Sequence, residues 1–178
     1  MAQGNVNNYQ AAPNSSNVDV IENGFDKWVK VYNDTGADVS NGAIYELAYE
    51  VDATDTSNPI IRAILKAAAT EAVSVVEIAV VDNSPLGKDS IVSTEYGYCK
   101  VRGYVLARCD GSTDIAVGDQ LEILNAAASF IVAAAATAGD SGVLIDETAA
   151  IAMEAYTLTV AANKKVLLVG RPCVVKAS

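Results

Sequence analysis

Histidine is absent from this chain of 178 residues. Nucleophilic catalysis by Ser or Cys normally needs a neighbouring base, most often His, so the common catalytic triads are excluded. A Ser–Lys or Thr–N-terminus variant is conceivable, but no nucleophile sits in a recognisable strand–turn–helix elbow. The phosphate-binding patterns GxxxxGK[ST] and GxGxxG are also missing. We therefore predict that the protein is not an enzyme and that it needs no cofactor.

Basic residues are scarce: 12 Lys and Arg stand against 22 Asp and Glu, which gives a net charge of −10. Binding to nucleic acid needs a concentrated basic face, so a nucleic-acid partner is not expected. A local basic patch is the alternative, but charges on solvated strand faces explain the same residues better. The candidate cations are Lys27, Lys30, Lys100, Arg102, Lys164, Lys165 and Arg171.

Cysteine is also rare, with three residues and no CxxC spacing. Cys99 alternates in phase with Val101 and Val105, so it is expected to be a small buried apolar side chain. Free thiols are typical of a reducing compartment. No stretch has the layout of a signal peptide, and the apolar run Phe130–Ala136 is too short to span a bilayer. We expect a soluble protein made in a cytoplasm, without a membrane partner.

The densest acidic cluster is Asp110, Asp114 and Asp119, with Gly111 and Gly118 among them. This spacing does not supply the alternating oxygen ligands and terminal Glu of an EF-hand loop. Capping of turns by the carboxylates explains it better than a loose calcium site does. No metal site is predicted.

The first 24 residues are rich in Asn, Gln and Ser and cannot bury enough apolar surface to fold alone. They form either a frayed terminus or an extended arm that becomes ordered on a partner. The spaced apolar residues Tyr9, Val18, Val20 and Ile21 favour the arm.

Short segments with a two-residue apolar period, separated by turn residues, predict strands throughout residues 25–178. In Tyr96–Arg108, for example, Cys99 and Val105 take one face and Lys100 and Tyr104 the other. Glycines inside this strand predict bulges or bends of a small barrel. The fold class is therefore all-β, a small barrel or tulip-like sandwich of short antiparallel strands. The predicted strands are Lys27–Tyr32, Ala43–Val51, Ala72–Val81, Tyr96–Arg108, Gln120–Leu124, Ser129–Ala134, Val143–Ile145, Ala150–Ala155 and Lys165–Val169.

Two segments allow a second interpretation. Pro59–Ala69 could begin a helix at its proline, although Ile60, Ile61 and Ile64 favour a strand. Ala149–Ala155 could be a helical turn, although its alternation favours a strand. The region 52–95, with its long loops, could also be an inserted subregion of the domain.

An internal similarity recurs at an offset of 76 residues. The residues Asp34, Asp38, Gly42 and Glu46 are repeated as Asp110, Asp114, Gly118 and Glu122. This indicates either a duplicated half-barrel or a turn–strand pattern used twice, and we favour the second.

From Trp28 onward the layout resembles small phage virion proteins that decorate or cement icosahedral heads. The segments that carry the resemblance are VKVYNDTGADVSNG (29–42), GYCKVRG (97–103), DGSTDIAVGDQLEIL (110–124), AIAMEAY (150–156) and the closing strand Val166–Gly170.

The resemblance implies a trimeric β-barrel or tulip-like protein bound to the major capsid protein on the outside of the virion. Residues 1–24 would then reach across neighbouring subunits. Aromatic residues are favoured interface anchors, which singles out Trp28 and Tyr32 beside the arm, although Trp28 could equally pack in its own core. The alternatives are a head-fibre base or tail component and a carbohydrate-binding β-sandwich that uses Tyr96, Tyr98 and Tyr104.

Overall fold

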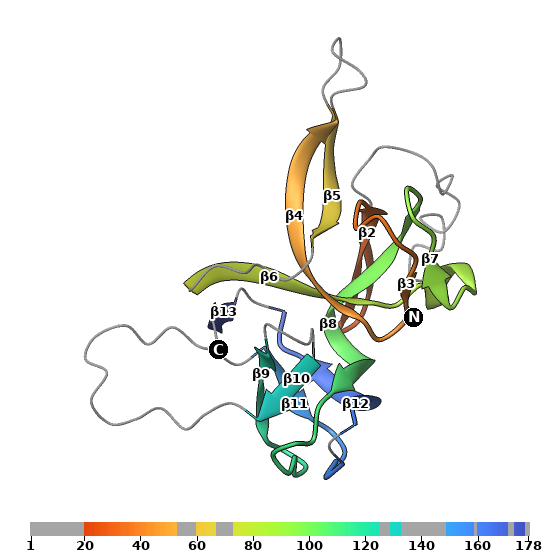
Figure 1. Ribbon diagram of the computed structural model, residues 1–178. Helices are drawn as coiled ribbons and strands as arrows, with labels where there is room; N and C mark the ends of the chain where they lie inside the picture. Colours follow the sequence, from red (N-terminus) through yellow and green to blue (C-terminus); the bar gives the residue numbers. More distant parts are fainter. Residues whose placement is uncertain are drawn as a thin grey trace.

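A computed structural model of the chain describes residues 20–52, 60–66, 73–124, 129–132, 149–158, 160–170 and 173–176. Within these ranges the chain consists of strands and turns, with one short 3-10 turn, η2 (Ser84–Leu86), and no α-helix. The prediction of an all-β fold built on a small barrel is confirmed (Figure 1). The arm as far as residue 19, most of the loop after Asp52 and the predicted strand Val143–Ile145 lie outside the described residues.

The predicted strands that fall in these ranges are all present, and Pro59–Ala69 and Ala149–Ala155 contain strands rather than helical turns. The short strands β1, β3, β7 and β13 were not predicted. In chain order the strands are β1 (Val20–Asn23), β2 (Asp26–Asn33), β3 (Val39–Ser40), β4 (Ile44–Asp52), β5 (Ile60–Lys66), β6 (Val73–Val81), β7 (Ser90–Ile91), β8 (Tyr96–Cys109), β9 (Gln120–Leu124), β10 (Ser129–Val132), β11 (Ala150–Ala152), β12 (Ala162–Leu168) and β13 (Cys173–Lys176).

The first barrel is a closed ring of β2, β5, β4, β6 and the first half of β8, which returns to β2. Its neighbours are antiparallel except β2 and β5, which are parallel. Because β5 and β6 are walls of this ring, the described strands of the region 52–95 belong to the barrel rather than to an insertion. The small ladder between β3 and β7 adds Val39 and Ile91 to the barrel's core.

The N-terminal strand β1 lies outside this ring and pairs with β2, with Ile21 opposite Trp28. A two-residue turn joins the strands, and Gly24 in it adopts a φ of 63°. Residues 20–24 therefore belong to the folded body, so the boundary of the expected arm lies before Val20 and not after Gly24.

The second barrel is a closed ring of the second half of β8 with β10, β9, β11 and β12. The long strand β8 is thus shared: its first half pairs with β2 and its second half with β12. Figure 1 shows β8 running from the upper group of strands into the lower one. Gly103 marks the change, because its φ is 108° and a β-carbon there would collide with Asp26.

The two rings have the same connectivity. The parallel pair β2–β5 of the first barrel corresponds to β8–β10 of the second. The antiparallel pairs β4–β5 and β4–β6 correspond to β9–β10 and β9–β11. The closing pair of β2 with β8 corresponds to β8 with β12. Within the described residues, the repeat therefore extends to the complete pairing scheme of a barrel.

Individual hydrogen bonds repeat as well. The Gly42 N–H donates to Val81 O, and the Gly118 N–H donates to Ala152 O, both at 2.8 Å. The two glycines have φ values of 93° and 94°, a conformation that side chains other than glycine avoid. The similarity at an offset of 76 residues is therefore a duplicated barrel, and our preference for a merely recurrent turn pattern was wrong.

Each barrel has its own apolar core, and β8 contributes to both. Cys99 and Val101 face the first core, whereas Val105, Ala107 and Cys109 face the second. The first half of β8 is buried on both faces, because Ile21, Trp28 and Tyr98 pack over its outer side. The largest fully buried side chains include Leu65 in the first core and Phe130 and Leu121 in the second.

Candidate functional site

The four arm residues singled out in the sequence divide into two groups. Tyr9 and Val18 lie outside the described residues. Val20 and Ile21 lie on β1, where Val20 is half-buried against the first core and Ile21 is buried against Trp28 and Tyr98. These two side chains stabilise the body of the protein.

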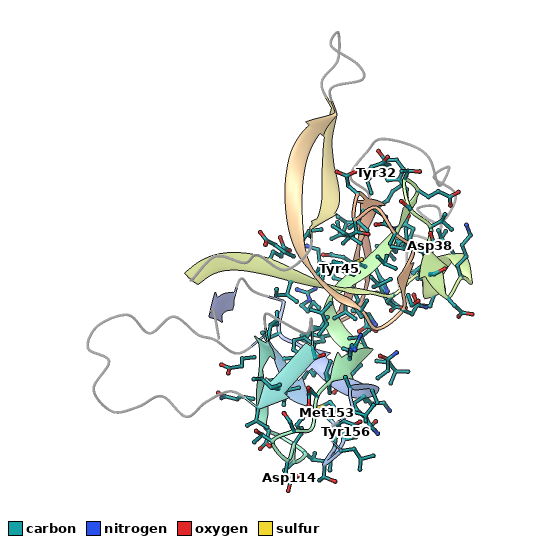
Figure 2. All side chains as sticks on the ribbon, viewed as in Figure 1. Tyr32, Asp38, Tyr45, Asp114, Met153 and Tyr156 are labelled. Carbon is teal, nitrogen blue, oxygen red and sulfur yellow. The ribbon has the colours of Figure 1, made fainter. Side chains whose placement is uncertain are left out.

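The aromatic candidates Trp28 and Tyr32 lie on the outer side of β2. Trp28 is 9% exposed and its indole N–H donates to the Asp82 carboxylate at 2.8 Å. Tyr32 is half-buried, and its ring lies 5.2 Å from that of Tyr96. Trp28 therefore packs within its own chain, and Tyr32, labelled in Figure 2, keeps only part of its side chain on the surface.

Lys100 is the centre of a polar cluster beneath this aromatic layer. Its side chain is 6% exposed, and its ammonium group lies 4.1 Å from the centre of the Trp28 ring. The ammonium lies 3.4 Å from an Asp26 oxygen and 3.9 Å from an Asp82 oxygen, and it donates to Tyr104 O at 2.7 Å. A cation so well surrounded by acceptors and an aromatic face ties β2, β6 and β8 together.

The expectation that the basic residues lie on solvated strand faces is wrong for Lys30 and Lys100. Counted over the whole residue, they are 2% and 5% exposed. The Lys30 ammonium lies over the Tyr96 ring at 5.1 Å. Alternation along β2 and β8 placed both lysines on the outer side of the barrel, but β1 and the aromatic side chains cover that side. One signal could have indicated this, namely a Trp and a Lys on the same face of two neighbouring strands.

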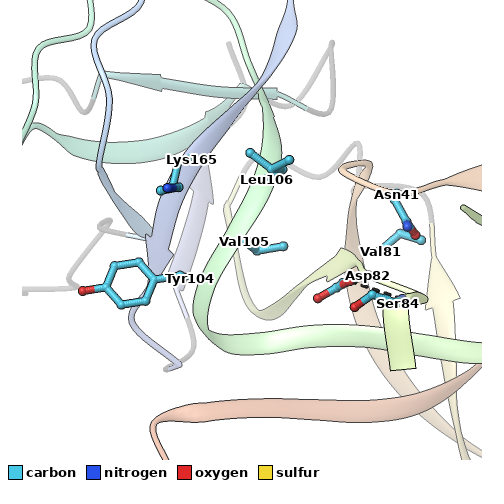
Figure 3. A pocket seen from close by; sticks show the side chains of 8 residues that line it. All are labelled: Asn41, Val81, Asp82, Ser84, Tyr104, Val105, Leu106 and Lys165. Atoms are coloured by element: carbon cyan, nitrogen blue, oxygen red, sulfur yellow. Dashed lines mark hydrogen bonds between the residues drawn. The ribbon is translucent and has the colours of Figure 1, made fainter. Parts of the chain in front are cut away.

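A groove of about 370 Å³ lies where the two barrels meet. Its walls come from β8 and β12 on one side and from the end of β6, η2 and the β3–β4 turn on the other (Figure 3). The surface of the groove is mainly apolar, although four of the eight lining residues are polar or charged. The residues are Asn41, Val81, Asp82, Ser84, Tyr104, Val105, Leu106 and Lys165.

Large exposed apolar side chains fall into two groups among the described residues, apart from Val92. The first, which we call the junction face, consists of Tyr104 and Leu106, which line the groove, and Phe25 on the turn between β1 and β2. The second, which we call the barrel tip, consists of Val117, Leu158 and Val160 on the turns at one end of the second barrel.

Backbone hydrogen bonds hold the turns of the barrel tip together. Ile115 N–H donates to Tyr156 O at 2.8 Å, and Gly111 N–H donates to Leu158 O at 3.1 Å. The two segments are therefore antiparallel neighbours, with Leu158 opposite Gly111 and Val117 on the other side of the Ile115–Tyr156 pair, next to Gly118, which donates to Ala152 O. All three side chains thus lie exposed on the turns at the same end of the second barrel.

The acidic cluster before β9 caps turns, as predicted. Asp110 accepts from Ser112 N–H at 2.9 Å, and Asp119 accepts from Ala116 N–H at 2.7 Å. Nowhere in the described ranges do three or more Cys, Asp or Glu side chains group so that they could hold a metal ion.

A salt bridge on the second barrel joins β12 to the turn that follows β11. The Lys164 ammonium donates to the Glu154 carboxylate at 2.9 Å. This hydrogen bond, together with the Lys165 N–H, lowers the pKa of Glu154.

The two described thiols are buried and free. Burial raises the pKa of Cys109 to about 12, and it raises the pKa of Cys99 as well. The thiolate is the reactive form, so both side chains are inert packing groups at neutral pH.

The three tyrosines of the carbohydrate-binding alternative do not form a shared exposed surface. Tyr98 is buried, Tyr96 packs against Tyr32, and among the three tyrosines only Tyr104 is largely exposed. The described part of the chain contains no helix long and apolar enough to cross a membrane.

Comparisons with known proteins add no further constraint. No family model matches the sequence, and neither the curated proteins nor the solved structures gave a match.

Proposed function

We propose that this protein is a structural virion component that binds the outside of a phage capsid and reinforces the lattice of the major capsid protein. The observation that carries the proposal is the distribution of polar and apolar side chains among the described residues. The buried polar groups hold the barrels together, whereas large apolar side chains remain exposed at the junction face and the barrel tip. Such a molecule can bind a protein surface without chemistry of its own.

The architecture supports this role. A shared strand and two closed barrels give a rigid body with few open strand edges, which limits unwanted pairing between copies. Many copies on a repetitive shell gain attachment through multivalency, so no single contact has to be strong. The sequence resemblance to decoration proteins points the same way and implies a homotrimer. Residues 1–19 then serve as the arm that contacts neighbouring subunits.

Cosedimentation with purified empty heads of the source virus tests the proposal. We expect the protein to sediment with the heads and to saturate at a fixed number of copies per capsid subunit. Failure to bind heads under conditions in which the protein is folded would contradict it. Binding to isolated tails but not to heads would favour the alternative of a tail component.

A further inference from the structure

Comparison of the two barrels shows that the second has no described strand equivalent to β1 of the first. At an offset of 76 residues, the positions of β2 that pair with β1 correspond to Arg102–Val105 of β8. Trp28, which faces Ile21 of β1, corresponds to Tyr104, which is 52% exposed. The chain places a short strand beside the first barrel and has no described strand beside the equivalent edge of the second. This uncovered edge is one wall of the groove.

Side chains partly replace the absent strand. Tyr104 N–H donates to the Asp26 carboxylate at 3.2 Å, and Tyr104 O accepts from Lys100 at 2.7 Å. Four residues further along, the Arg108 N–H donates to Gly42 O at 2.9 Å on the same side of the strand. Capping of this kind, by side chains at Tyr104 and by the Gly42 backbone at Arg108, protects an edge that would otherwise pair with another chain.

Leu106 lies between these capped positions. Backbone groups alternate between the two edges of a strand, so the N–H and C=O of Leu106 point to the same side as those of Tyr104 and Arg108. None of the described hydrogen bonds outside the strand ladders satisfies them. The groove therefore contains a donor and an acceptor spaced for an extended backbone, next to the aliphatic side chains of Val81 and Val105.

The charges beside the groove indicate what kind of segment fits. Lys165 and Arg108 are exposed, and no salt bridge joins either to another described residue, although the charge of Lys165 contributes to the lowered pKa of Glu154. The carboxylates of Asp26 and Asp82 are already engaged by Lys100. A segment with an aliphatic side chain for the groove and a carboxylate for its cationic rim is therefore complementary. The strand β1, Val-Ile-Glu-Asn, uses the same types of residue at the equivalent edge of the first barrel.

We propose that the open edge of β8 at Leu106 is a strand-addition site for a short, extended, aliphatic and acidic segment of the capsid protein to which this chain binds. Main-chain hydrogen bonds to Leu106 fix the register, and the groove takes an aliphatic side chain. This inference rests on the proposed function and names the contact that carries it.

The variant L106P tests the site. Proline removes the Leu106 N–H and blocks an added strand, whereas the bonds to β12 are made by the residues on either side. The control is L106V, which keeps the N–H and an aliphatic side chain. We expect L106P to weaken cosedimentation with empty heads at least about tenfold and L106V to bind like the wild type. Thermal melting shows whether both variants are folded.

Hydrogen exchange at the Leu106 amide gives a second readout that needs no substitution. We expect the amide to exchange more slowly in the head-bound wild type than in the free protein. If L106P is folded and binds heads as the wild type does, or if exchange at Leu106 is unchanged on binding, the site is wrong although the protein still binds capsids. If L106P instead abolishes self-association measured by sedimentation velocity without affecting head binding, the occupant is a second copy, which also overturns the proposal.

Discussion

Gly42 and Gly118, 76 positions apart, adopt the same left-handed backbone conformation and donate equivalent hydrogen bonds to the ends of equivalent strands. Their surroundings differ in one respect. A β-carbon at Gly42 would collide with the Asn163 side chain, whereas the space around Gly118 is open.

This difference predicts unequal effects of the same substitution. G118A should cost about 1 kcal/mol, because alanine disfavours the left-handed region. G42A should cost about 3 kcal/mol, since it adds a steric conflict where the two barrels touch. Denaturant unfolding of both variants measures this difference. Equal losses would mean that the contact with Asn163 relaxes freely.

Removal of the buried cation should destabilise the protein far more than removal of an exposed one. K100M leaves Asp26 and Asp82 without their cation and Tyr104 O without its donor, and we expect a loss of about 3 kcal/mol in the free energy of unfolding. K165M, the matched control at the exposed rim of the groove, should change it by less than about 0.5 kcal/mol. A similar small effect for both variants would contradict the role given to Lys100.

The raised pKa values of the thiols make stability depend on pH in the alkaline range. In the unfolded chain the Cys109 thiol ionises near its ordinary value of 9.0, whereas in the folded protein its pKa is about 12. The folded state then binds more protons, so stability should fall as pH rises from about 9 to 12. Chemical unfolding across this range, compared with the variant C109A, detects the contribution. A slope that is the same in both proteins would contradict it.

The barrel tip should matter for binding and not for folding. V117D and L158D each replace a side chain that is 64% exposed by a charged one. The free energy of unfolding should therefore change by about 0.5 kcal/mol at most. Cosedimentation with empty heads should be weakened if the tip contacts the shell.

The matched control for the tip is V92D, because Val92 is also exposed but belongs to neither apolar group. It should bind heads as the wild type does. If V92D and V117D weaken binding equally, the loss reflects added negative charge and not the tip.

Much of the fold could be predicted because its strands are long enough to show a two-residue period. Tyr96–Arg108 and Ala72–Val81 are examples, and both form strands within one residue of the predicted bounds. The ladder of β3 and β7 has two residues in each strand, too few to establish any period. The strand β1 is also short and polar at its end, so composition assigned it to the arm.

The polar cluster and the groove could not be predicted in the same way. The burial of Lys100 depends on β1 and Trp28 covering the outer side of β8, which is a property of the tertiary structure and not of alternation. The sequence repeat was visible at four positions. Its extent became clear only from strand pairing, because most of the equivalent core positions hold different apolar residues, such as Leu65 and Phe130.

A single continuous strand, β8, forms part of the wall of both barrels. Tension that enters through one barrel is therefore carried into the other along covalent bonds, with no linker between them to stretch. Under the proposed function, a copy attached to the shell through both barrels would hold its two points of attachment at a fixed distance.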